Sequence, residues 1–137
     1  MSSLPTPPKG ESYFRTLFEA CGEAFIVTNA QGQAVDCNDA ALALYACRRS
    51  DILGTTPLDW SPALQPDGKR SDERAAEIFS QAAAGETVCF EWENYRLGGE
   101  PLFVHVTVRH AVIDAQVCYL VVSRNISDRK KAEDALR

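Results

Sequence analysis

Hydrophobic residues recur with helical spacing near the start of the chain. Between residues 11 and about 21, apolar side chains fall at positions i, i+3, i+4 and i+7, namely Phe14, Leu17, Phe18 and Cys21. This spacing places them on one face of an amphipathic helix, which Gly22 is suited to end. Residues 1–10 contain three prolines and no hydrophobic block, so they predict a disordered leader and no signal peptide.

The next part of the chain predicts a hairpin followed by short helices. Residues 24–28 and 34–37 form two apolar, partly β-branched runs, with a turn at 29–32 between them. Asn38 is suited to cap a short helix over residues 40–45. Ser50 or Asp51 can cap a further helical turn that stops at Gly54, and residues 55–70 form a proline-rich loop.

The second half of the chain predicts one longer helix, three strands and a last helix. A helix opens at Ser71 and ends at Gly85, and its apolar face consists of Ala75, Ile78, Phe79 and Ala82. Residues 88–93 and 102–109 alternate between apolar and polar positions, as half-buried strands do, and Gly98 and Gly99 join them. A third strand spans residues 117–126, and a helix that Ser127 or Asp128 can cap continues to the end of the sequence.

This order of elements predicts an α+β protein with an antiparallel sheet, because runs of strands are separated from runs of helices. The 137 residues are enough for one domain with a core of its own. The net charge of -5 argues against direct binding to nucleic acid. No apolar run approaches the roughly 20 residues that span a bilayer, so we expect no membrane segment.

The cysteines point to a reducing compartment. Five cysteines at irregular spacings, without a CxxC pair, support neither a disulfide framework nor a zinc site. We therefore expect free thiols in a cytoplasmic protein, and no metal site.

Several stretches, taken in order, resemble the PAS domain family of sensors, also called the S-box family. Residues 30–41 resemble that family's turn glycine, second strand and helix-capping asparagine, and residues 50–54 its next helix end. Residues 61–68 and 90–92 resemble a loop and a strand of one PAS subgroup, and residues 125–133 the junction with the output helix. At Asn125 the family usually carries an aspartate, so here the amide keeps the hydrogen bonding without the charge.

The resemblance implies the PAS fold: a five-stranded antiparallel sheet with short helices on one face, an N-terminal amphipathic helix and a C-terminal exit helix. It divides the chain into a leader (1–10), a PAS domain (11–128) and the start of an output helix (129–137). In this family the sheet and the short helices enclose a pocket, and its occupancy shifts the flanking helices.

Five residues are candidates for contact with a ligand in such a pocket: Trp60, Trp92, Tyr45, Phe79 and Asn94. The alternative is that all five belong to the core or its rim, where large aromatic residues are also common. Four others are candidates for structural or signalling roles. They are Asn38 as a helix cap, Asn125 at the junction, and Asp128 and Arg129 at the start of the exit helix.

No cofactor is evident. His105 lies on the polar face of its strand and His110 near a strand end, so neither is placed as a haem ligand. The cysteine motif of flavin-binding photosensors is absent. Glu91 and Glu93 lie opposite the apolar strand face, where a solvated pair is expected, and no catalytic motif occurs, so we expect no enzyme.

The predicted function is that of a sensory input domain in a bacterial-type signal-transduction protein, such as a two-component regulator, or in a transcription regulator. It would bind a small molecule, form a homodimer and pass a conformational change through its C-terminal helix to a kinase, cyclase or DNA-binding effector. The alternative is a ligand-free dimerisation or protein-interaction module that uses the first helix and the outer sheet face, with Phe103 and Tyr119 exposed there. A small α+β enzyme that depends on Glu91 or His105 is a third reading.

Overall fold

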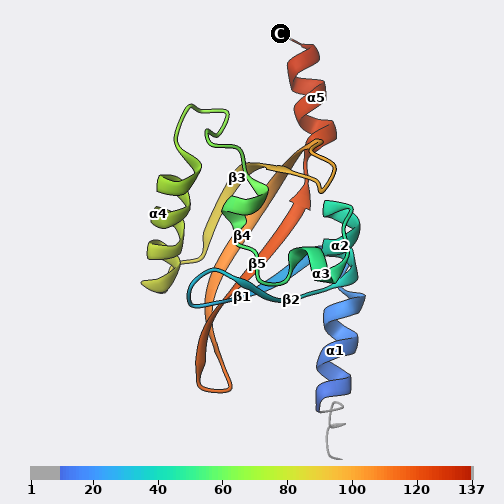
Figure 1. Cartoon of the computed structure of the whole chain (residues 1–137), viewed down its shortest axis with the longest axis vertical. Coiled ribbons are helices and arrows are strands. Elements are labelled where there is room, and N and C mark those ends of the chain that lie inside the picture. The colour runs from blue at the N-terminus through green and yellow to red at the C-terminus, as the bar shows by residue number, and fades with distance from the viewer. Residues whose placement is uncertain (1–9, 137) are drawn as a thin grey trace, which may run out of the picture.

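The computed structural model describes residues 10–136 and shows the predicted α+β order (Figure 1). Most of the predicted leader and Arg137 lie outside the described residues. The elements follow the chain as α1 (Glu11–Ala20), β1 (Ala24–Asn29), β2 (Ala34–Cys37), α2 (Asp39–Tyr45), α3 (Arg49–Ile52), the 3-10 helix η1 (Pro57–Trp60), α4 (Ser71–Ala83), β3 (Val88–Tyr95), β4 (Pro101–Ile113), β5 (Gln116–Asn125) and α5 (Ser127–Ala135).

The five strands form one antiparallel sheet in the order β2-β1-β5-β4-β3. The predicted five-stranded antiparallel fold is therefore confirmed. One row of paired residues crosses four strands, and it consists of Phe90, Val106, Ser123 and Ala24. Directly paired residues share a face of the sheet, so this row brings residues that are distant in the sequence to one wall.

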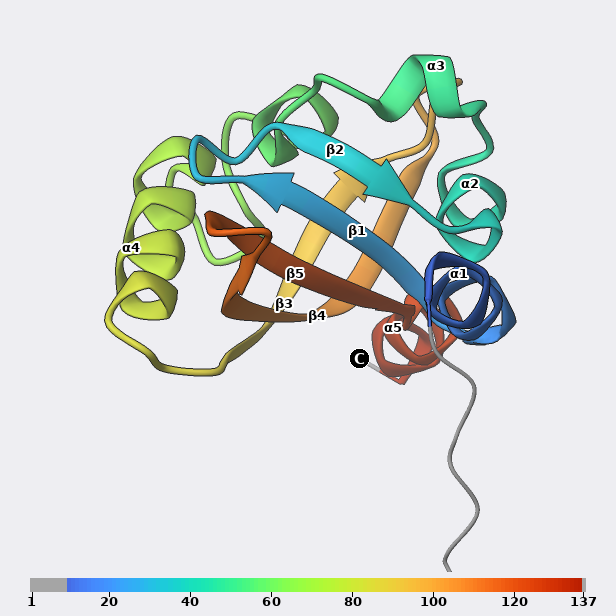
Figure 2. The ribbon, with the colours of Figure 1, turned by 90° about the horizontal axis from the view of Figure 1, so that it is seen from below.

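One face of the sheet is buried under helices. On β4 the alternation of Leu102, Val104, Val106 and Val108 leaves each of them at most 5% exposed. Ile78 of α4 is buried in the same cluster. Figure 2 shows α4 at the left and α2 with α3 at the right and upper right of the view, and Figure 1 shows α1 and α5 at opposite ends of the long axis. None of the helices between residues 10 and 136 is long and apolar enough to cross a bilayer.

Several local predictions were wrong at helix ends. Ile126 is the N-cap of α5, while the Ser127 hydroxyl accepts a hydrogen bond from the backbone N–H of Phe103. Arg48, not Ser50 or Asp51, is the N-cap of α3. Asp51 is the third residue of that helix, and its carboxylate accepts the backbone N–H of Arg48. Short polar residues satisfy helix ends from more than one position, which the sequence alone does not distinguish.

Three other expectations need correction. Extended Cys21 ends α1, one residue before Gly22. The proline-rich loop contains η1, and α5 ends at Ala135 rather than running to the last residue. Tyr119 is not an exposed contact of the outer face, because it is 6% exposed and packs edge-to-face on Phe79 of α4, with ring centroids 5.0 Å apart. The odd-numbered residues of β5 face the helices, and Tyr119 follows that alternation.

Candidate ligand-binding site

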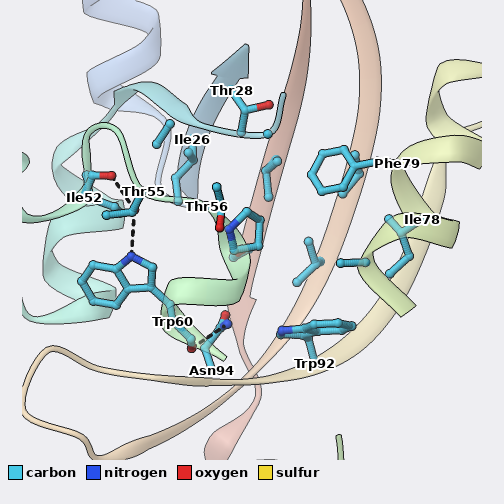
Figure 3. A pocket seen from close by; sticks show the side chains of 18 of the residues that line it. Ile26, Thr28, Ile52, Thr55, Thr56, Trp60, Ile78, Phe79, Trp92 and Asn94 are labelled. Carbon is cyan, nitrogen blue, oxygen red and sulfur yellow. Dashed lines mark hydrogen bonds between the residues drawn. The ribbon is translucent and has the colours of Figure 1, made fainter. Parts of the chain in front are cut away.

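A cavity lies between the sheet and the helices α2, α3 and α4 (Figure 3). The volume that the centre of a water molecule can reach inside it is about 80 Å³. All five residues that the sequence proposed as ligand contacts line its wall: Tyr45, Trp60, Phe79, Trp92 and Asn94. They come from α2, η1, α4 and β3. Contact between these residues and a ligand stays a prediction.

Aromatic rings form much of this wall. Tyr45 and Trp60 meet edge-to-face with centroids 5.4 Å apart, and Phe90 and Trp92 do so at 5.6 Å. Edge-to-face contacts set the positive ring edge against the negative ring face and so fix ring orientation. The wall therefore presents oriented aromatic surfaces to the cavity.

The polar side chains at one corner of the cavity are joined to one another. The Tyr45 hydroxyl donates to Oδ1 of Asn94 at 2.8 Å. Asn94, which is 5% exposed, donates from Nδ2 to the carbonyl of Trp60 at 3.1 Å and to Oγ of Ser61 at 3.2 Å. Figure 3 shows Asn94 between Trp60 and Trp92. The amide thus links β3 to the segment that ends η1.

The indole N–H groups are also used inside the protein. Trp60 donates from Nε1 to the hydroxyl of Thr55 at 2.9 Å, and Trp92 donates to the hydroxyl of Ser61 at 2.9 Å. Thr55 donates in turn to the carbonyl of Ile52 at 2.6 Å. These bonds fix the orientation of both indoles, which line the cavity.

The phenol of Tyr45 is held in its neutral form. Its burial raises the pKa of Tyr45 to about 12, and a hydrogen bond with Ser123 of β5 opposes that rise to a smaller extent. Tyr45 is therefore a neutral hydrogen-bonding group of the cavity at any physiological pH.

The sequence reasoning missed several residues of this site. Thr28 and Ser123 are each 2% exposed and line the cavity from β1 and β5. Thr55 and Ser61 lie beside it in the loop and accept the two indole N–H groups. A single polar residue inside an otherwise apolar strand, as with Ser123, was the available signal, since buried hydroxyls require a partner.

Gln65 fastens the loop that precedes α4 to the edge strand β3. Its Oε1 accepts the backbone N–H of Glu93 at 2.8 Å. Its Nε2 donates to the carbonyl of Glu93 at 3.2 Å and to the hydroxyl of Ser71 at 2.9 Å. The side chain is buried, so this contact fixes the loop that supplies Trp60 and Ser61.

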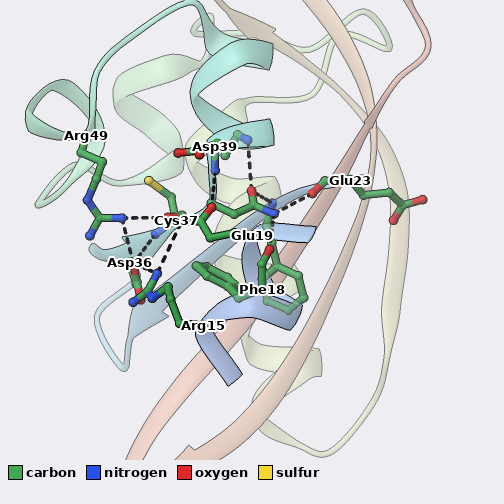
Figure 4. Close-up of polar contacts among 11 residues, drawn as sticks. Arg15, Phe18, Glu19, Glu23, Asp36, Cys37, Asp39 and Arg49 are labelled. Carbon is green, nitrogen blue, oxygen red and sulfur yellow. Dashed lines mark hydrogen bonds and ion pairs between the residues drawn. The ribbon is translucent and has the colours of Figure 1, made fainter. Parts of the chain in front are cut away.

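A second polar centre, around Asn38, connects α1, β1 and α2; Figure 4 shows its neighbours Phe18 and Glu23. Asn38 is fully buried, and its Oδ1 accepts the backbone N–H groups of Phe25 at 2.9 Å and Ala41 at 3.1 Å. Its Nδ2 donates to the carbonyls of Phe18 at 2.9 Å and Glu23 at 3.0 Å. The residue caps α2 as predicted, and it also joins α2 to the end of α1 and the start of β1.

Asp36 reinforces the same region. Arg15 of α1 and Arg49 of α3 donate to its carboxylate at 2.8 Å and 3.0 Å (Figure 4). Burial favours the neutral carboxyl, but the hydrogen bonds from Arg15 and Arg49 outweigh it, and the pKa of Asp36 lies below its ordinary value. α1 is thus attached to the domain through charged and polar contacts at β2.

The junction between β5 and α5 is built from the predicted signalling residues and their neighbours. Oδ1 of Asn125 accepts the N–H of Ser127 at 2.9 Å. The N–H of Ile126 donates to the carbonyl of Phe103 at 2.8 Å, so the first residues of α5 are bound to the backbone of β4. Asp128 is exposed in the first turn of the helix.

Glu91 attaches the first turn of α5 to the outward face of β3. Its carboxylate accepts hydrogen bonds from Arg129 and pairs with Nζ of Lys130 at 2.9 Å. Arg129 and Lys130 lower the pKa of Glu91 through these bonds. Within the helix, Arg129 and Lys130 both pair with Glu133.

The described residues hold no cluster of three or more histidines, cysteines or acidic residues arranged to bind a metal. The five cysteines are all free thiols. His110 packs against the ring of Tyr119, with centroids 5.9 Å apart.

The model of a family described as the PAS fold matches residues 18–131. Among solved structures, the chain is similar to the PAS domain of an HTR-like protein from Haloarcula marismortui, with a TM-score of 0.71 and 22% identity, over 84% of this chain and 90% of that chain. It is similar to a domain of the sensory box sensor histidine kinase/response regulator from Geobacter sulfurreducens, with a TM-score of 0.67 and 20% identity, over 82% and 91% of the two chains.

The PAS domain of a protein from Colwellia psychrerythraea gives a TM-score of 0.73 at 18% identity, over 86% of this chain and 98% of that chain. No curated protein matches the sequence. At these identities the similarity to solved structures shows a shared fold.

Proposed function

The chain belongs to the PAS family, and on that premise we propose that it is the sensory input domain of a bacterial-type signal-transduction or transcription-regulatory protein. It binds a small molecule in the cavity between the sheet and α2–α4. Occupancy biases the position of α5, which carries the signal to a downstream kinase, cyclase or DNA-binding effector.

One observation carries this proposal: β5 serves both the cavity and the exit helix. Val121 and Ser123 line the cavity, and two residues after Ser123, Asn125 accepts the N–H of Ser127 at the start of α5. Protein cores are close-packed, so a displacement of the strand at Ser123 also displaces Asn125, two residues further along. The route from ligand to helix is therefore short and continuous.

β3 offers a second route with the same end point. Trp92 and Asn94 face the cavity, while Glu91, the residue before Trp92, faces outward and binds Arg129 and Lys130 of α5. Two strands thus connect the cavity to the first turn of one helix. This arrangement supports α5 as the output element.

The role we propose is binding rather than catalysis. The hydroxyl and amide groups around the cavity are paired with one another, whereas a general acid or base needs a group free to exchange a proton with substrate. Glu91, the acidic residue of β3 that pairs with Arg129 and Lys130, faces α5 and not the cavity.

Native mass spectrometry of the purified protein, with the denatured mass as reference, tests ligand binding. Extra mass that disappears on denaturation supports the proposal, and Trp92→Ala should then abolish the extra mass. Amide hydrogen exchange over residues 127–135, compared between the protein as purified and the protein unfolded and refolded free of ligand, tests the relay. Unchanged exchange in α5 on ligand removal would contradict the relay.

A ligand-free dimerisation module is the second candidate, and the exposure of Leu17 on α1 favours it. Leu17 on α1 is 53% exposed, although it belongs to the apolar stripe of that helix. Val27, Leu120 and Val122 on the outward sheet face are only half-buried. A bare chain mass at twice the monomer value, lost in Leu17→Glu, would favour this function. Trp92→Ala would then cost only stability, about 3–5 kcal/mol.

A further inference from the structure

We propose that the cavity selects a small uncharged aromatic molecule about one ring in size, and rejects anions and cations of the same size. The proposal rests on the ligand-binding role proposed above and specifies its ligand class. It follows from three properties of the wall: its charge, its hydrogen-bond donors and its volume.

The described residues that line the cavity include no charged side chain. The ordinarily ionisable group on the wall is the phenol of Tyr45, which stays neutral because burial raises its pKa to about 12. Transferring an ion from water into such a site without a partner charge is strongly unfavourable. A carboxylate or an ammonium group therefore has no compensating interaction on this wall.

The donors around the cavity are already in use. The indole N–H groups of Trp60 and Trp92, the amide of Asn94 and the hydroxyl of Tyr45 all donate to protein acceptors at 2.8–3.2 Å. An anion requires free donors, and these are committed. The hydroxyl oxygens of Thr28 and Ser123 keep acceptor capacity, so one hydroxyl or N–H on a ligand can still be satisfied.

The volume and shape of the cavity set the size of the ligand. A dry cavity of roughly 150 Å³ holds one benzene molecule, and this cavity offers about 80 Å³ before any side chain moves. Trp60, Phe79 and Phe90 are the half-buried rings of the wall, and the tip of Phe79 would lie 3.9 Å from a Cβ placed on Gly32 in the β1–β2 turn. A one-ring ligand therefore requires half-buried side chains of this wall to move, and Phe79 is the first candidate.

Four probes with the same ring test the selection by charge: benzene, phenol, benzoate and benzylammonium, each added to the full chain at neutral pH. The chain has two tryptophans, so the two indole N–H signals in a ¹⁵N-correlated NMR spectrum report on opposite sides of Asn94. We expect benzene and phenol to shift both signals. At a free probe concentration ten times Kd, they should raise the Tm by about 5 °C. Benzoate and benzylammonium should do neither.

Matched variants on α4 locate the binding. Ala75 lines the cavity and Ala76 next to it is exposed, so Ala75→Leu should abolish the benzene response while Ala76→Leu preserves it. If Ala75→Leu does not fold, the indole shifts in the wild-type protein carry the localisation.

The outcomes separate this proposal from the proposed function. Benzoate or benzylammonium binding that is lost in Ala75→Leu would overturn the ligand class while leaving a small-molecule sensor. No response to any of the four probes would also overturn the ligand class, and co-purified mass could still support the sensor. Binding of benzene without a change in α5 would support the ligand class and contradict the relay.

Discussion

The hydroxyl of Tyr45 on α2 donates a 2.8 Å hydrogen bond to Oδ1 of Asn94 on β3, and both side chains are buried. The bond joins residues 49 positions apart and connects a helix to an edge strand at one corner of the cavity. Through Asn94 it extends to Ser61 and the carbonyl of Trp60. Helix, loop and sheet are thus connected at a single amide.

Removing the Tyr45 hydroxyl should destabilise the domain. Tyr45→Phe leaves Oδ1 of Asn94 buried without its donor, and we expect the free energy of unfolding to fall by about 1–3 kcal/mol. Urea unfolding at neutral pH measures this difference. Tyr95→Phe, at an outward position of the same sheet, is the control and should change it by less than about 0.5 kcal/mol. Equal effects of the two variants would contradict the role of the bond.

Alkaline pH should weaken the fold through the same residue. The pKa of Tyr45 is raised to about 12, so the folded state keeps a proton that the unfolded state releases near pH 10. Stability is therefore complete below pH 10 and declines toward pH 12, by about 3 kcal/mol in total. Urea titrations across this range, with Tyr45→Phe as reference, should show the decline reduced in the variant. A parallel decline in both proteins would refute the assignment to Tyr45.

Asn38 should be among the most sensitive positions of the chain. Asn38→Ala leaves four backbone groups without their partner in a fully buried position, and we expect a loss of about 3 kcal/mol or more. Asn38→Asp keeps the acceptor but loses the donors to Phe18 and Glu23. This variant should regain part of its stability as the pH falls. Burial raises the pKa of the introduced carboxyl group, and its protonated form can donate one hydrogen bond. Thermal unfolding at pH 7 and pH 5 measures both variants, and an Asp variant that is more stable at pH 7 would contradict this account.

The attachment of α5 should depend on the charge of Glu91. Glu91→Gln removes the pairing with Arg129 and Lys130, so amide exchange in the first turn of α5 should become faster. Its depressed pKa means that the pairing is complete above the ordinary glutamate range and is lost as the pH falls through the lowered value. Glu93→Gln on the same face of β3 is the control, since no ion pair joins Glu93 to α5. Similar exchange in both variants would show that Glu91 does not hold the helix.

Much of the architecture was readable from periodicity. The alternation of Leu102, Val104, Val106 and Val108 predicted the buried face of β4, and the apolar face of α4 placed Ile78 against the sheet. Large residues bury large areas, so their spacing records which face is inside. For the same reason the five candidate cavity residues, all large or polar at inward positions, do line the cavity.

What the sequence did not reveal depends on contacts between distant segments. Tyr119 and Ser123 lie in an apolar run whose inward phase only pairing with β1 and β4 fixes. The roles of Ser61 and Thr55 as acceptors for two indoles depend on where the loop folds back, and no local pattern encodes that. α5 begins at Ser127, so Ile126 occupies the N-cap position without a side-chain cap, and the Ser127 hydroxyl instead accepts the N–H of Phe103.

The contact between Gln65 and Glu93 has a consequence for solubility. β3 is an edge strand, and the N–H and C=O of Glu93 point away from β4. Free backbone groups of this kind template the addition of a further strand from another molecule, which is how sheets join into aggregates. Because the Gln65 amide occupies both groups, that rung of the edge is closed. One loop side chain therefore protects the domain against edge-to-edge aggregation at the strand that carries Trp92 and Asn94.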